Sequence, residues 1–273
     1  MILHKAITFR MFKHKEDIVP VLLVLALTVV DFTLYFTVDR LGVLVAYWLL
    51  MLIPKGVICA WNHHHQHTMT FRSAALNRFL ELCYAFHTGV TSNLWVLHHV
   101  LGHHRHFLDQ TRDESRWMRA DGKTMNPLEY TFDVALTSYY RGYQVGKRYH
   151  KAQKVFVVFS LLTLALLLGL IAYRPLQALF LFVLPMAISL LFTAWVTYDH
   201  HSGLHTDNEF EASYNNTGRF FNVLTGNLGY HTAHHHKQGL HWSKLPALHE
   251  QIKDKIPQRL YRESTFDFML GQG

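Results

Sequence analysis

The sequence predicts an all-α integral membrane protein with four transmembrane helices, and three features of the 273-residue chain support this fold class. Charged residues make up only 16% of the chain, whereas a typical soluble domain has about 25%. Apolar residues make up 50% and are concentrated in runs long enough to cross a bilayer. Histidine is unusually frequent, with 22 copies. This composition indicates a membrane protein that also binds metal.

Four apolar runs are the expected membrane spans, at residues 18–38, 41–61, 155–173 and 176–198. Within each pair only two residues separate the runs: Asp39 and Arg40 in the first pair, Arg174 and Pro175 in the second. Connections this short require two helical hairpins that open to the same side. We therefore expect a single membrane domain over residues 1–273, made of two hairpins and a histidine-rich helical cap.

The distribution of basic residues predicts the orientation. The N-terminal tail has 4 and residues 62–154 have 12, against one in each hairpin loop. The positive-inside rule then places both termini and the histidine-rich cap in the cytosol. The expected membrane is the bacterial inner membrane rather than the endoplasmic reticulum. A weaker apolar stretch at 80–97 is interrupted by polar residues, so we interpret it as interfacial or re-entrant.

Two charged residues, Asp31 and Lys55, lie inside the first and second runs. Ionisable residues within spans usually face the interior of the helix bundle or a water-filled path. For Asp31, a role in helix packing is an equally good interpretation.

Several classes of protein are excluded by the same sequence. Two cysteines, Cys59 and Cys83, cannot form a disulfide scaffold for a chain of this length. The net charge of +7 is better explained by membrane topology than by nucleic-acid binding, because the basic residues flank apolar runs. Neither a Walker loop nor a dinucleotide-binding loop is present. The sequence also shows no sign of an electron-donor domain. We therefore expect the electrons for any redox reaction to come from a separate partner.

Seventeen histidines fall in four short windows, at residues 63–67, 98–106, 200–205 and 231–241. Two windows directly follow a predicted span, and we expect all four at one membrane face. A four-residue spacing on a helix places two imidazoles on the same face. An adjacent histidine points about 100° away and can reach a second metal.

Nine histidines are the candidate ligands, which suits two metal ions with four or five ligands each. They are His63, His67, His99, His103, His104, His201, His231, His234 and His235. Asp199 and Asn227 are the expected second-shell partners that fix the imidazole tautomers, and Asp109, Asp113 and Glu114 are further candidates nearby in sequence. Imidazole binds iron, copper, nickel and zinc, so spacing alone does not select the element.

These clusters resemble the histidine boxes of the membrane-bound fatty acid desaturase and hydroxylase superfamily. His63 to His67 matches HxxxH, His99 to His104 matches HxxxHH, and His231 to His235 matches HxxHH. The segment from Val196 to Leu204 is similar to the part of related alkane monooxygenases that supplies an isolated histidine ligand, which selects His201 over His200. Eight other histidines remain outside the set: His64, His65, His98, His106, His200, His205, His236 and His241.

The resemblance implies a diiron oxidoreductase that uses O2 and two electrons to desaturate a membrane fatty acyl chain. It also implies a separate electron donor, either a ferredoxin or a cytochrome b5 with its reductase. Three alternatives remain at this point: a fatty acid or alkyl hydroxylase, an oxidative decarboxylase that forms terminal alkenes, and, outside the family, a metal carrier. A carrier should hold its ligands near the middle of the spans, and the four predicted spans contain no histidine.

Overall fold

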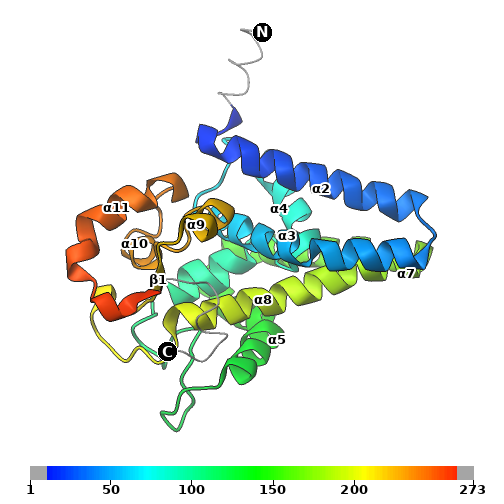
Figure 1. The fold of residues 1–273 in the computed structure, drawn as a ribbon. Coiled ribbons are helices and arrows are strands. Elements are labelled where there is room, and N and C mark those ends of the chain that lie inside the picture. Colours follow the sequence, from blue (N-terminus) through cyan, green and yellow to red (C-terminus); the bar gives the residue numbers. More distant parts are fainter. Residues whose placement is uncertain (1–10, 263–273) are drawn as a thin grey trace. The chain divides into compact units, whose positions relative to one another are not determined.

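The computed structural model describes residues 11–262 and confirms the predicted all-α membrane fold (Figure 1). Among these residues, four helical stretches are long and apolar enough to cross a membrane: Lys15–Thr37, Leu41–His67, His150–Tyr173 and Pro175–His201. Each contains most of one predicted span. The predicted single domain also includes residues 1–10 and 263–273, which lie outside the described residues, and it stays a prediction.

Contacts divide the chain into two compact units. In the described residues, the span unit consists of 11–95 with 149–190, and the cap unit consists of 96–148 with 191–262. The span unit contains η1 (Lys15–Asp17), α2 (Ile18–Thr37), α3 (Leu41–His67), α4 (Ala74–Thr88), α6 (His150–Tyr173), α7 (Pro175–Ala178) and the π-helix η3 (Leu179–Val183). Helix α8 (Leu184–His201) begins in the span unit and ends in the cap unit.

Apart from α5, which has 20 residues, the cap unit is built from short helices and the end of α8. It contains the π-helix η2 (Val96–His103), α5 (Pro127–Gly146), η4 (Glu209–Glu211), α9 (Arg219–Thr225), α10 (His231–His236), η5 (Trp242–Lys244), α11 (Leu245–Ile252), η6 (Lys253–Lys255) and η7 (Gln258–Leu260). Strands β1 (Asn215–Asn216) and β2 (Tyr261–Arg262) pair in parallel. A hydrophobic core joins α10 and α11 through Ala233, Leu245 and Leu248.

The first hairpin is α2 followed by α3, which runs back after a three-residue turn (Figure 1). Helix α3 extends six residues beyond the predicted span end at Trp61, so His63 and His67 lie on the same continuous helix. Helix α8 likewise continues to His201. The predicted interfacial stretch at 80–97 contains the end of α4, which has 15 residues. Because a span needs about 20 residues, α4 is too short to cross a bilayer.

A cluster of polar side chains lies between α2, α3 and η3 in the span unit. Lys55 Nζ lies 2.7 Å from Asp31 Oδ2, and both side chains are almost fully buried. The Tyr47 hydroxyl donates to Asp31 Oδ1 at 2.7 Å. Lys55 also donates to the Leu181 carbonyl at 3.0 Å. These contacts explain why Asp31 lies inside the helix bundle.

The Leu181 carbonyl lies four residues before Pro185. In an α-helix, the carbonyl of residue 181 accepts from the N–H of residue 185, and proline has no N–H. The chain forms the π-helix η3 just before this proline, a common adjustment where the regular ladder is interrupted. In the span unit, Lys55 therefore neutralises Asp31 and also satisfies a backbone acceptor.

We expect Lys55→Met to destabilise the protein by about 3–5 kcal/mol, because it leaves the Asp31 carboxylate buried without its cation. The double variant Asp31→Asn/Lys55→Met should recover much of this loss, since it removes both charges. Thermal unfolding in detergent measures both effects. A double variant no more stable than Lys55→Met would contradict the role of the ion pair.

Candidate metal centre

One group of histidines in the cap unit joins η2, α8 and α10. The ring nitrogens of His103, His201 and His235 lie within 4.8 Å of one another, and all three residues are buried. The Nε2 atoms of His103 and His201 are 3.3 Å apart. The ring of His235 packs against that of His201, with 4.6 Å between centroids. Three residues far apart in the sequence therefore bring donor atoms to one point.

His231 extends this group from one turn earlier on α10. Its Nε2 lies 3.0 Å from Nε2 of His201. Burial, reinforced by neighbouring histidines, lowers the pKa of His231 well below its usual value. The ring is therefore neutral at pH 7, the form of imidazole that binds a metal.

A second group in the cap unit contains His99, His104 and His234, whose ring nitrogens also lie within 4.8 Å of one another. The Nε2 atoms of His99 and His104 are 3.0 Å apart. This group adjoins the first, because the rings of His104 and His235 stack with 4.0 Å between centroids. The cap unit thus holds two adjacent clusters of imidazole donors.

The pairing within the second window differs from the expected four-residue spacing. The amide of His104 donates to the carbonyl of His99 at 2.9 Å, which is the i to i+5 bond of a π-helix. This wider turn places His99 beside His104, while His103 joins His201 and His235. The expectation that adjacent histidines serve different groups agrees with the positions of His103 and His104, and of His234 and His235.

The span unit holds the remaining predicted pair. His63 and His67 lie one turn apart on α3, and their rings stack with 4.7 Å between centroids. The predicted common face is therefore present.

Hydrogen bonds fix the orientation of two histidines in the first group. Nδ1 of His103 lies 2.9 and 3.0 Å from the two carboxylate oxygens of Asp113. Nδ1 of His201 donates to the Ala212 carbonyl at 2.8 Å. In both residues Nε2 is the atom that faces the other histidines. This is the usual division of roles between the two nitrogens of a metal-binding imidazole.

Asp199 and Asn227, which we expected to hold the ligand imidazoles in place, contact other groups. Asp199 forms an ion pair with Arg262, whose guanidinium lies over the Tyr214 ring. The Asn227 amide donates to the Trp242 carbonyl at 3.2 Å, and Asn227 has a positive φ of 63°. These contacts join α8 to β2, and the segment before α10 to η5. Asp113, rather than Asp199 or Asn227, makes the expected contact with a candidate ligand, His103.

Several histidines outside the nine have other contacts. His65 Nδ1 lies 2.9 Å from the Thr70 hydroxyl, and its Nε2 lies 3.4 Å from Glu81. His200 stacks on His231 with 3.9 Å between centroids. His236 contacts Glu209 at 3.1 Å. His65 and His236 thus contact carboxylates, and His200 packs against a candidate ligand.

The chain belongs to the fatty acid desaturase family, because the family comparison matches residues 39–266 to it, a range that includes all nine candidate ligands. This match confirms the family that the histidine boxes resemble. A search of curated proteins found no match, and a search of solved structures found none either.

The donor set fits iron, the metal that the family implies. Imidazole nitrogen is the only donor type in either cap-unit group, and imidazole is a suitable ligand for iron. In addition, the buried Nδ1 of His231 has no hydrogen-bond partner among the described residues. A cluster of imidazole nitrogens that converge on one point is chemically suited to a cation.

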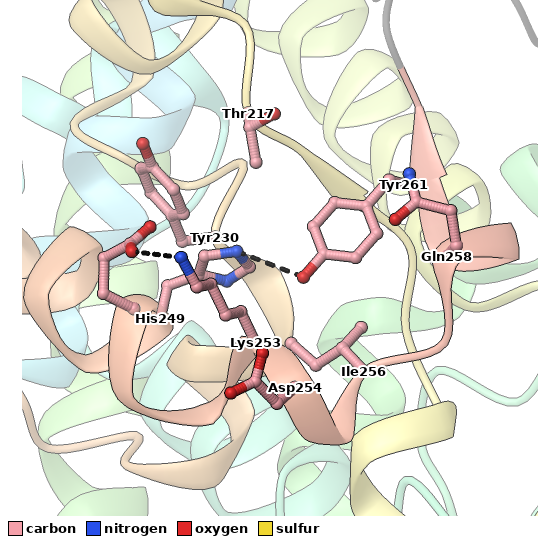
Figure 2. Close-up of a pocket in the computed structure, with 9 residues that line it drawn as sticks. Thr217, Tyr230, His249, Lys253, Asp254, Ile256, Gln258 and Tyr261 are labelled. Atoms are coloured by element: carbon pink, nitrogen blue, oxygen red, sulfur yellow. Dashed lines mark hydrogen bonds and ion pairs between the residues drawn. The ribbon is translucent and has the colours of Figure 1, made fainter.

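A separate cavity of about 440 Å³ opens on the cap unit (Figure 2). His249 lies buried in its wall, with Nε2 3.3 Å from the Tyr261 hydroxyl and its ring against that of Tyr230. Lys253 pairs with Glu250 at 2.7 Å. Tyr230 directly precedes the candidate ligand His231, so this wall supports the start of α10.

We expect Asp113→Asn to weaken iron binding by about 10–100-fold, because the uncharged amide holds His103 less firmly. The variant keeps an oxygen to accept from the Ser115 amide, which now donates to Asp113 Oδ1 at 2.7 Å, so the local fold should survive. Competition with a chelator measures the affinity. Asp121→Asn, at an exposed site, is the matched control, and equal affinity in both variants would contradict this role.

Burial lowers the pKa of His249, with Glu250 acting in the opposite direction. The unfolded chain takes up this proton below about pH 6.5, while the folded protein resists it. Folding stability should therefore fall as the pH drops below that value. We expect His249→Asn to flatten the dependence of Tm on pH, with the exposed His150→Asn as control. Identical profiles for His249→Asn and the wild type would exclude this contribution.

Proposed function

We propose that this chain is a diiron enzyme that uses O2 to desaturate a fatty acyl chain in the membrane. The observation that carries the proposal is the convergence of two adjacent all-histidine clusters in a protein of the fatty acid desaturase family. One iron ion would be held by His103, His201, His231 and His235. The other would be held by His99, His104 and His234. Bound iron supplies the capacity to activate O2 for attack on an unactivated C–H bond.

We assign His63 and His67 to the second ion on the basis of ligand number. His99, His104 and His234 provide three donors, and an ion with four or five ligands needs more. The α3 pair is the remaining box of the family pattern and already shares one helix face. Iron content of the His63→Ala variant tests this assignment.

The chemistry of desaturation defines what must reach the site. Removal of two hydrogen atoms from adjacent carbons with one O2 consumes two electrons and two protons and releases two water molecules. The electrons would come from a separate one-electron carrier of the ferredoxin or cytochrome b5 type. The apolar spans would keep the acyl chain in the bilayer, while cytosolic histidine clusters receive electrons and protons. We propose that both termini are cytosolic and that the membrane is the bacterial inner membrane.

The chain's own residues would act by holding and shielding the site. Asp113 and the Ala212 carbonyl fix the rings of His103 and His201, so that their Nε2 atoms remain directed to a common point. Burial of all three His residues of the first group excludes water. Exclusion of water strengthens the electrostatic interactions and limits side reactions.

Mass spectrometry of lipids and hydrocarbons from cells that express the chain tests the reaction. We expect a new acyl species two mass units lighter than a native one, absent in His234→Ala and retained in the exposed control His150→Ala. A product heavier by one oxygen atom would indicate a hydroxylase, and a released terminal alkene a decarboxylase. Unchanged lipids with normal iron binding would overturn the enzyme assignment and favour a metal carrier.

A further inference from the structure

Helix α5 of the cap unit has a continuous apolar face exposed to its surroundings. Its members are Leu128, Phe132, Leu136, Tyr140 and Tyr143, with exposed fractions of 70%, 51%, 77%, 66% and 44%. They recur at intervals of four, four, four and three residues, which places them in one stripe along the helix. We call this set the α5 stripe. In water, a helix normally exposes polar residues at such positions.

The opposite face of α5 is firmly packed. Val134, Ala135, Gly142 and Val145 are buried, and the helix contacts η2, the segment that carries His99 and His103. The buried Arg141 donates to the Glu114 carbonyl at 2.6 Å and also pairs with Asp133. The orientation of α5 about its own axis is thus fixed by its inner contacts, and the α5 stripe is the face left outside.

The sequence after α5 leads directly into a membrane span. Only three residues separate Gly146 from α6, which is long and apolar enough to cross a bilayer. Four basic side chains stand at this junction: Lys147, Arg148, Lys151 and Lys154. Clusters of lysine and arginine beside a span bind anionic lipid headgroups. Tyrosine, present twice at this end of the α5 stripe, is enriched at the boundary between membrane and water.

We propose that α5 lies in the membrane surface, with the α5 stripe in contact with lipid and the basic junction on anionic headgroups. The occupant of this face is the same bilayer that the four spans cross. Continuity with α6 and the matching charge support lipid as the occupant in preference to a second protein chain. Because α5 packs on η2, the contact would hold the histidine helix of the cap unit beside the source of a lipid substrate, a consequence that rests on the proposed function.

Spin labels on the full-length protein in nanodiscs that contain anionic phospholipid test this placement. A nitroxide is attached at Leu136→Cys or, separately, at Phe132→Cys, in a Cys59→Ala/Cys83→Ala background. Both sites are exposed, so the substitutions remove little packing. The control label is at Lys123→Cys, in the loop before α5, where the native side chain is 76% exposed. Collision with apolar O2 and with a water-soluble nickel chelate is compared at each site.

We expect the labels on α5 to collide readily with O2 and to collide several-fold less with the nickel chelate than the label at 123 does. Nickel access equal to that at 123 would show a stripe in water and overturn the proposal. Protection from both reagents would show a protein partner or a second copy and would also overturn it. Neither result depends on turnover, so an inactive protein with lipid-exposed labels would disprove the proposed function and leave this inference standing.

Discussion

The structure of the cap unit depends on the need to pack many imidazole rings together away from water. A buried polar nitrogen without a partner is costly, so the rings must be arranged around shared points. This constraint accounts for the short distances from Nε2 of His201 to Nε2 of His103 and to Nε2 of His231. The outer nitrogens of His103 and His201 are satisfied by Asp113 and by a backbone carbonyl, which leaves the inner nitrogens available to a cation.

A comparable constraint governs the span unit, where backbone groups and charges have few water molecules available. Pro185 has no N–H to donate, and a buried lysine from α3 donates to the Leu181 carbonyl four residues before it. That lysine is stable in apolar surroundings because Asp31 from α2 neutralises it. Charged side chains from two spans thus meet a backbone carbonyl of a third.

The two faces of helix α5 lie in different environments: one is packed inside the cap unit and the other is exposed. Its small residues, such as Ala135 and Gly142, permit close packing near η2, and its large apolar residues face outward. Length and periodicity alone mark it as amphipathic. Only the packing of its inner face reveals that the apolar side is the exposed one, because in a soluble protein the same pattern would point the apolar side into a core.

The sequence by itself determined the membrane class, the four spans, the two hairpins and the histidine clusters, because bilayer thickness demands long apolar runs and imidazole ligands must be clustered. It also placed His63 and His67 on one helix face. It did not determine which histidines share a group, since the π-helical turn that pairs His99 with His104 leaves no mark in the spacing. The partners of Asp199 and Asn227 were also decided only in the tertiary structure, where Arg262 and the Trp242 carbonyl come from distant parts of the chain. Spacing along the sequence determines which side chains share one face of a helix. Contacts between distant segments depend instead on how the whole unit packs.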